Sequence, residues 1–470
     1  MLRCQYRYLH ELLPDYDLPE KRFYNHIMQS NIRQCRQHPE GSPVPWRTIR
    51  KDLPGAISHR LKSLLKIGGY WPDHCRVYQV HEEHLLEYTG ISARLSAEEH
   101  LSEPYVCFET GRLMNTPPQS RLTSDSNHKL PPIPRAAIEV LSRNGCFANL
   151  PGIDSVMRMR EVEYEAACAR PVCAPLERER LKGRLINDRS CRDSFYSYRP
   201  VQYSGDIYFY RPAWKVVSTG RLHVGGGCMQ SASGEMKRRA YEIEGVENYD
   251  IVSSQIFITI TLLQQVGLDA SWLIDYYDLH NYEWYGEQAG IPGKLFKHIV
   301  IALCMGAHLP TVGQLARIER SSILKILGAV AEDEQHLASL VRDLREVVGD
   351  LAAVLKDWHR HLLDHYIPAN RVKGYLPNAV GMNINLTELN LDQPRYRSEG
   401  ISRVAAHLLQ GLEAVCIQEM IARSDEANFM PISCEHDGFI VSSGKADMSL
   451  WSEITAGHGL GGMKLVQKAL

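Results

Sequence analysis

The sequence lacks the features that mark three classes of protein. No stretch approaches the roughly 18 to 20 consecutive apolar residues that would span a bilayer, and residues 1–30 lack the apolar core of a signal peptide. The 12 cysteines form no CxxC pair and no Cys/His ligand spacing. We therefore expect a cytoplasmic protein with no membrane partner, and reduced structural thiols in place of a disulfide framework or a zinc ribbon.

Strong net charge is also missing. With 53 Lys and Arg against 55 Asp and Glu, the formal net charge is −2, so the chain has no global basic signature of nucleic-acid binding. Any nucleic-acid surface must therefore be local. What remains is an ordinary globular composition, with 44% apolar and 23% charged residues. At 470 residues the chain exceeds the usual size of one compact domain, so we expect two or three structural units.

Residues 43–80 follow the order of a winged helix or helix-turn-helix. A short helical segment, a turn at Pro54-Gly55, a second basic amphipathic helix and a break at Gly68-Gly69 precede a strand-like run. Three basic side chains of the second helix could reach phosphates, namely Arg60, Lys62 and Lys66. A solvated face on a small helical domain explains the same residues equally well, so both interpretations stay open.

The rest of the chain divides by composition and periodicity. Residues 115–135 are rich in Pro, Ser and Asn, which predicts a linker and a boundary near residue 130. The pattern is then helical over 135–192, strand-like from about 195, helical over 255–367 with an interruption at Gly290–Gly293, and helix-then-strand over 400–445. This order suits an α+β domain that carries an inserted helical subdomain.

One aspartate stands in each of two apolar, strand-like segments. Asp250 lies within Tyr249–Val252 and precedes an apolar helical run, and Asp437 with Gly438 fits a tight turn between two short apolar strands. A buried acid is costly without a partner or a metal ion. Nucleotidyl transfer uses two divalent ions about 3.5 to 4 Å apart, and carboxylates on strand ends can hold them. Taken alone each site is weak, because an Asp-Gly pair is far more often a plain turn.

A candidate phosphate ligand lies between these two segments. Lys297, Ile301 and Met305 recur at i, i+4 and i+8, so a cation and two apolar side chains would line one face of a helix. A lysine beside a triphosphate neutralises the charge that develops on transfer. The alternative is a surface lysine on an amphipathic helix.

The order of these segments resembles the polymerase core shared by family A DNA polymerases and bacteriophage-type single-subunit RNA polymerases. Asp250 matches the aspartate of the first palm motif, and His436-Asp437 matches the histidine-aspartate of the last. Lys297 with Met305-Gly306 matches the fingers helix, whose lysine precedes a tyrosine-glycine pair by the same spacing. The resemblance implies that Asp250 and Asp437 bind two Mg²⁺ ions, with Mn²⁺ as a possible substitute.

Two further stretches resemble the DNA-polymerase branch. Ser218–Leu222, followed by Gln230 and the basic run Lys237–Arg239, resembles the segment that packs on the primer-template minor groove. Arg403 with Gln410-Gly411 resembles the helix before the last motif, whose glutamine also approaches the duplex. The residues implied in nucleic-acid binding are Arg221, Gln230, Arg238, Arg403, Gln410 and His436.

The resemblance implies an α+β right-hand fold of palm, fingers and thumb. It divides the chain into an N-terminal helical, winged-helix-like domain (1–130), a helical thumb-like region (131–195), a first palm part (196–260), fingers (261–374) and a second palm part (375–470). No set of exonuclease carboxylates is evident near the N-terminus, so proofreading is not expected. Glu435 could assist the metal site, or it could be an exposed turn carboxylate.

The sequence departs from the family pattern in the nucleotide site. Gly293 stands where an arginine usually precedes the fingers lysine, and the adjacent Lys294 could supply the charge with less bidentate geometry. Met305 replaces a tyrosine beside the incoming sugar. Counting five residues from Asp250 puts Gln255 at the position that contacts the sugar, where its bulk should crowd a 2′-hydroxyl. Aligning on Ser-Gln-Ile would put Phe257 there, but would place Val252 where a metal ligand is needed.

These features predict a compact DNA-directed DNA polymerase, of the kind expected in a bacterial, phage or mobile-element context. Its partners would be a DNA template-primer and nucleoside triphosphates. One alternative is an RNA polymerase or primase that starts chains without a primer, with RNA as template or product. Another is a non-catalytic nucleic-acid-binding protein that keeps the palm shape, and the two intact aspartates count against it.

Overall fold

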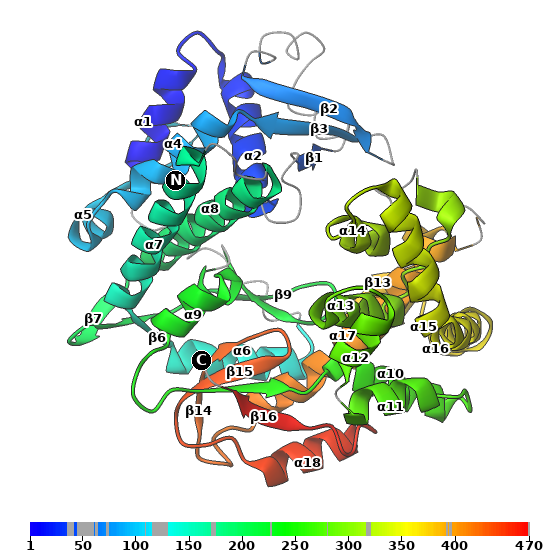
Figure 1. The fold of residues 1–470 in the computed structure, drawn as a ribbon. Coiled ribbons are helices and arrows are strands. Elements are labelled where there is room, and N and C mark those ends of the chain that lie inside the picture. The colour runs from blue at the N-terminus through cyan, green and yellow to red at the C-terminus, as the bar shows by residue number, and fades with distance from the viewer. Residues whose placement is uncertain are drawn as a thin grey trace.

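The computed structural model describes residues 1–34, 42–44, 61, 64–71, 75–108, 110–114, 130–170, 175–225, 228–279, 281–315, 321–391, 393 and 397–468. Figure 1 shows an N-terminal layer (the described part of residues 1–114) at the top, a central sheet at the bottom and a helical lobe (the described part of residues 254–370) at the right. The predicted mixture of helices and strands is confirmed. Among the described residues, no helix is both long and apolar enough to cross a bilayer.

Short helices and strands make up the N-terminal layer. They are α1 (Arg3–Leu12), α2 (Leu18–Gln34), β1 (Ser42–Val44), β2 (Leu65–Trp71), β3 (Cys75–Val80), α4 (Glu82–Ala93), α5 (Ala97–Ser102), β4 (Tyr105–Val106) and β5 (Leu113–Met114). Gly68 and Gly69 lie inside β2, where they mark an irregularity in the pairing with β3 and not the predicted break before a strand. The exposed Lys66 belongs to the same strand. Pro54-Gly55, Arg60 and Lys62 lie outside the described residues.

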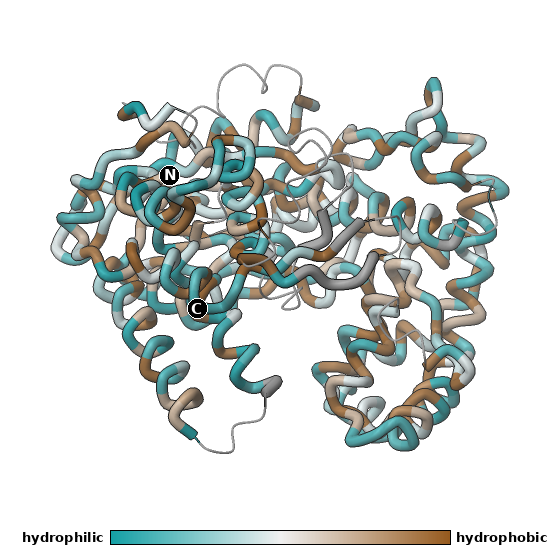
Figure 2. The backbone as a smooth tube through the Cα atoms, turned by 90° about the horizontal axis from the view of Figure 1, so that it is seen from above, coloured by the Kyte–Doolittle hydropathy of each residue, from teal (hydrophilic) through white to brown (hydrophobic). Residues whose placement is uncertain are grey.

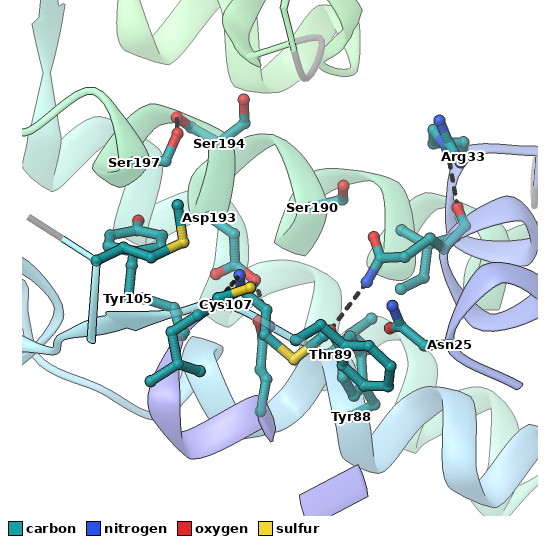
Figure 3. Close-up of a pocket in the computed structure, with 18 residues that line it drawn as sticks. Asn25, Arg33, Tyr88, Thr89, Tyr105, Cys107, Ser190, Asp193, Ser194 and Ser197 are labelled. Carbon is teal, nitrogen blue, oxygen red and sulfur yellow. Dashed lines mark hydrogen bonds between the residues drawn. The ribbon is translucent and has the colours of Figure 1, made fainter. Parts of the chain in front are cut away.

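Buried polar contacts join this layer to helix α8 (Pro175–Ser197). Asp193 on α8 accepts hydrogen bonds from the Gln5 amide (3.1 Å) and the Ser92 hydroxyl (2.6 Å), and His100 Nε2 lies 3.1 Å from its other oxygen. Asp193 also lines a cavity of about 560 Å³, which Figure 3 shows. The boundary near residue 130 stays a prediction, but segments on its two sides share these buried contacts.

The predicted helices over 135–192 are confirmed, with one strand between them. The elements are α6 (Pro132–Asn144), β6 (Cys146–Asn149), α7 (Leu150–Ala169) and α8. β6 pairs with β8 (Ile207–Tyr210), which also pairs with β7 (Val201–Ser204). Gly145 makes the turn into β6 at φ +67°, where an added Cβ would lie 2.3 Å from the Phe209 ring. Helices α7 and α8 pack side by side and project as an arm in Figure 2.

The central sheet has four antiparallel strands in the order β14-β15-β11-β16. They are β14 (Met430–Cys434), β15 (Gly438–Ser443), β11 (Glu247–Ile251) and β16 (Leu465–Lys468). Along β11 the buried Tyr249 and Ile251 alternate with the less buried Asn248 and Asp250. Because successive strand residues face opposite sides, Asp250 points away from the core face on which Tyr249 stacks against Phe439.

Two short strands and a helix connect the arm to the sheet. They are β9 (Trp214–Val216), which pairs with β10 (Leu222–Val224), and α9 (Gly234–Ala240). They carry the residues that precede the first predicted motif. The strand-like pattern from about residue 195 is thus confirmed by β7, β8, β9 and β10.

The helical lobe follows β11 along the chain. It contains α10 (Ser254–Gln265), α11 (Ser271–Leu279), α12 (Tyr282–Gln288), α13 (Gly293–Cys304), α14 (Ser322–Gly328), α15 (Glu334–His361) and α16 (Ile367–Asn370). The predicted interruption at 290–293 is confirmed, since α12 ends before it and α13 begins at Gly293. Glycine is needed there because an added Cβ would lie 2.4 Å from a Glu283 carboxylate oxygen.

One long helix ties these parts together. Helix α17 (Arg397–Ala422) packs against α6, α10 and α18 (Met448–Gly457), and the hairpin β12 (Tyr375–Pro377) and β13 (Asn383–Asn385) precedes it. The predicted helix-then-strand order over 400–445 is confirmed by α17, β14 and β15. Because α17 contacts the first turn of α10 through side chains, residues on α17 can reach the end of β11.

Candidate active site

Asp250 lies on β11, and Asp437 directly precedes β15, the neighbouring strand. Asp250 is paired with Gly438 across β11 and β15, and the Ile251 N–H donates to the carbonyl oxygen of Asp437 at 2.8 Å. β15 can come this close only because residue 438 is glycine, since an added Cβ would lie 2.0 Å from the Tyr249 carbonyl oxygen. The predicted tight turn at Asp437-Gly438 is confirmed. The catalytic role of both aspartates stays a prediction.

The carboxyl groups of this pair influence each other directly. Burial, and then the negative charge of Asp437, raise the pKa of Asp250 to about 6, and the two carboxyls are close enough to hydrogen-bond. Lys468 on β16 opposes this shift, because its ammonium contacts the Asp250 carboxylate. Sequence analysis missed Lys468, which pairs in register with Asn248 and reaches Asp250 on the same side of the sheet.

The donor set of this pair fits a hard divalent cation. Two carboxylates bring four oxygen donors to one place, and Mg²⁺ prefers oxygen ligands. The Lys468 ammonium marks a position that already favours positive charge. Within the described part of the chain, no cluster of three or more His, Cys, Asp and Glu side chains could hold a metal ion. The binding of a metal ion by Asp250 and Asp437 stays a prediction, in which water and substrate phosphates would complete the coordination.

Added Mg²⁺ should raise the melting temperature of the protein, and the rise should shrink as the pH falls below about 6. The pKa of Asp250 is raised, so below about 6 its carboxyl holds a proton that competes with a cation. Above about 6 the Asp250 carboxyl has lost that proton, so a cation no longer competes with it. Thermal unfolding with and without Mg²⁺, on either side of that pH, measures the effect. An equal rise in Asp437→Asn would show that the ion binds elsewhere.

Lys297 lies within electrostatic reach of both aspartates. It is half-buried on α13, and burial followed by the charge of Lys468 lowers its pKa, while Asp250 and Asp437 act in the opposite direction. The side chain is therefore close to the carboxylate pair, as its predicted place beside a triphosphate requires. Lys294, one turn earlier, is exposed. Its phosphate contact stays a prediction.

The end of α13 carries the residue that replaces the family tyrosine. Met305 caps the helix and is half-buried, and Gly306 follows with φ +90°. The backbone of Gly306 approaches α17, because its carbonyl accepts a hydrogen bond from Ser402 at 2.6 Å. An apolar side chain is thus held at the predicted tyrosine position, and its contact with an incoming nucleotide stays a prediction.

A buried carboxylate that sequence analysis missed lies beneath the site. Glu413 on α17 is fully buried, forms an ion pair with Arg221, and accepts hydrogen bonds from the Ser254 hydroxyl (2.6 Å) and the Gln255 amide (3.2 Å). Burial raises the pKa of Glu413 to about 7, and the Arg221 cation opposes that shift. A lone acid inside an apolar helical run was the available sequence signal.

The position of Gln255 bears on the choice of register. Gln255 turns towards α17, whereas Phe257 packs against Tyr277 with ring centroids 5.6 Å apart. Two helical positions differ by about 200° around the axis, so the two side chains lie on opposite sides of α10. Gln255 is the one joined to Glu413 and, through it, to the neighbourhood of Asp437. The register counted from Asp250 stays a prediction.

Gln230 differs from expectation. It is buried, and its amide is bonded to the Val224 N–H (2.9 Å) and to the carbonyls of Leu222 (2.8 Å) and Cys434 (2.6 Å). These bonds tie β10 to β14, so the side chain does not face a duplex in this structure. A buried amide satisfies its donors and acceptor within the fold, and sequence alone cannot show that the nearby backbone groups are its partners.

The other residues predicted to contact nucleic acid differ in their exposure and in their partners. Arg221 is largely buried and paired with Glu413, and Arg238 pairs with Glu235 in its own helix. Arg403 is exposed and Gln410 is half-buried, both on α17. His436 lies beside His223, with ring centroids 4.8 Å apart and ring planes tilted by 42°. Contact of these residues with a duplex stays a prediction.

Glu435 has a partner other than the metal site. Its carboxylate forms an ion pair with Lys237 on α9 and accepts a hydrogen bond from the Ser433 hydroxyl at 3.1 Å. Neither of the two roles considered for Glu435 from the sequence includes this pairing. The ion pair connects the basic run of α9 to the turn that carries Asp437.

This chain resembles a solved structure weakly. No model of a known protein family matches the chain, and no curated protein matches it in sequence. Among solved structures, the POL domain of Pol1 from M. smegmatis, in complex with DNA primer-template and dNTP, superposes with a TM-score of 0.47 at 13% identity. The superposition covers 72% of this chain and 69% of that chain. A likeness of this size carries no argument about function, which must rest on the residues of this chain.

Proposed function

We propose that this protein is a template-directed nucleotidyltransferase, a compact DNA-directed DNA polymerase that works with two divalent ions. The observation that supports the proposal best is the meeting of Asp250 on β11 and Asp437 in the turn before the paired strand β15, with Lys297 in electrostatic reach of both. These three residues come from segments far apart in the chain, and each was selected from the sequence for one role in the same reaction.

The residues divide the work of nucleotidyl transfer among them. Two Mg²⁺ ions, when bound, would activate the attacking 3′-hydroxyl and hold the triphosphate. Asp250 and Asp437 would hold those ions, on strand ends that leave the carboxylates little freedom to move. Lys297, with the exposed Lys294, would neutralise charge on the triphosphate as it transfers. The lowered pKa of Lys297 reflects burial, which strengthens its attraction to a phosphate in the same site.

The proposal assigns parts of the fold to the parts of a polymerase. The central sheet and α17 would be the palm, the helical lobe the fingers, and the α7–α8 arm the thumb. Arg238, Arg403, Gln410 and His436 are predicted duplex contacts whose side chains are at least partly accessible. Arg221 would act beneath the duplex through its pairing with Glu413. A template-primer and deoxynucleoside triphosphates would be the substrates.

Extension of a labelled primer tests the proposal. The protein would be offered DNA and RNA templates, with dNTPs and NTPs in separate reactions, beside a reaction that lacks primer. We expect template-dependent extension of a DNA primer with dNTPs in the presence of Mg²⁺. Synthesis from NTPs without a primer would favour the RNA polymerase or primase alternative. Tight duplex binding with no incorporation under any condition would favour the non-catalytic alternative.

A further inference from the structure

The two carboxylate oxygens of Glu413 bind different partners. One carboxylate oxygen is paired with Arg221, and the other accepts from the Ser254 hydroxyl at 2.6 Å and from the Gln255 Nε2 at 3.2 Å. Ser254 and Gln255 open helix α10, four and five residues after Asp250. A buried carboxylate on α17 therefore holds the segment that joins the predicted metal ligand to the helical lobe.

This arrangement fixes the orientation of the Gln255 amide. An ionised carboxylate only accepts hydrogen bonds, so the NH₂ end of Gln255 must face Glu413 and the carbonyl Oε1 must face away. No described donor lies within hydrogen-bond distance of that Oε1, and it is not among the buried atoms that lack a partner. One end of the amide is therefore anchored in the protein, and the other has no hydrogen-bond partner among the described residues.

We propose that Glu413 is a positioning residue that determines sugar specificity, because it holds Gln255 as a fixed wall against the 2′-hydroxyl of an incoming nucleotide. The inference rests on the proposed function and names 2′-deoxynucleotides as the substrate class. A glutamine without an anchor could rotate to make room for a hydroxyl or to bond it. Rotation of Gln255 breaks its bond to Glu413 and leaves a buried carboxylate short of a donor, which is costly.

The proposed role belongs to the pair of Gln255 on α10 and Glu413 on α17, and not to the neighbours of Gln255. The Ser254 hydroxyl shares the same Glu413 oxygen, but Ser254 is buried and its bond leaves Gln255 untouched. Phe257, two residues further along α10, packs against Tyr277 on the other side of the helix. Ser254 thus provides a matched control, since its loss removes one bond to Glu413 without releasing the Gln255 amide.

The test compares kcat/KM for a dNTP and the matching NTP on one primer-template, at about pH 8, where the Glu413 carboxyl is mostly ionised. Glu413→Gln and Gln255→Gly should each lower the preference for the dNTP by roughly 10- to 100-fold. The double variant should be no less selective than Gln255→Gly alone, because each substitution removes the same feature, the Gln255 side chain anchored on Glu413. Ser254→Ala should keep the preference of the parent protein.

Further variants and outcomes separate positioning from folding. Glu413→Asp keeps the charge that Arg221 needs but withdraws the carboxylate from Gln255, so it should relax selectivity even if Glu413→Gln unfolds. Unchanged selectivity in a folded, active Glu413 variant would overturn the inference and leave the proposed function intact. A stronger preference for the dNTP would also overturn it, by showing that Gln255 bonds the 2′-hydroxyl. A parent protein that incorporates no nucleotide refutes the proposed function, and this inference with it.

Discussion

Asp250→Asn and Asp437→Asn should each reduce nucleotide incorporation at least roughly a thousandfold while leaving duplex binding close to that of the parent protein. Each change replaces a charged oxygen ligand with a neutral amide of the same size. Little packing is lost, because neither side chain belongs to the apolar core. Primer extension in single-turnover conditions measures the loss, and a fluorescence binding assay measures the affinity for the duplex.

The aspartate substitutions also lead to a prediction about thermal stability. In the parent protein, burial and then the negative charge of Asp437 raise the pKa of Asp250 to about 6. Removing either charge at neutral pH relieves the repulsion, so both variants should melt no lower than the parent. Glu247→Gln, on the same strand as Asp250, is the control for a carboxylate-to-amide change and should keep full activity. Near-normal extension by either aspartate variant would refute the metal-ligand assignment.

Arg221→Ala should lower the free energy of unfolding by about 3 to 5 kcal/mol, because it leaves the fully buried Glu413 without its cation. Chemical denaturation followed by circular dichroism measures this change. The double variant Arg221→Ala with Glu413→Gln should recover part of the loss, since no uncompensated charge remains. Equal destabilisation of the single and double variants would mean that lost packing of Arg221, and not the stranded charge, is responsible.

The loss of stability in Arg221→Ala should also depend on pH. The folded pKa of Glu413 is raised to about 7, above its ordinary value, so the folded protein binds more protons than the unfolded chain between those values. The contribution of Glu413 to the free energy of unfolding therefore falls as the pH rises from its ordinary pKa to about 7. Without Arg221 the pKa should rise further, so the penalty should be largest above about pH 7 and smaller near pH 5.

Sequence patterns located the aspartate pair because each aspartate lies in a short segment with its own local signature. Asp250 sits in an alternating strand that leads into a helix, and Asp437 precedes a glycine at a hairpin turn. Strand pairing then brings them together without further information. The helical stretches were also predictable, since their apolar residues repeat at helical spacing over many turns, as in α15.

The residues that sequence analysis missed depend on contacts between distant segments. Arg221 and Glu413 are 192 positions apart, and Asp250 and Lys468 are 218 positions apart. Nothing near Lys468 in the sequence indicates that β16 will pair with β11. Gln230 was misjudged for the same reason, because its backbone partner Cys434 is 204 positions away. At Gly68-Gly69, glycines predicted a break before a strand, but they lie inside β2, where the pairing with β3 becomes irregular.

Gly438 makes the meeting of the two aspartates possible, although it carries no charge and touches no substrate in the proposed reaction. Any side chain there would press on the Tyr249 carbonyl oxygen, 2.0 Å from the added carbon, and would force β15 away from β11. The displacement would shift Asp437 relative to Asp250 while the hydrophobic core on the other face of the sheet could still form. A genetic screen for inactive but soluble protein should therefore return substitutions of this glycine as often as substitutions of the aspartates themselves.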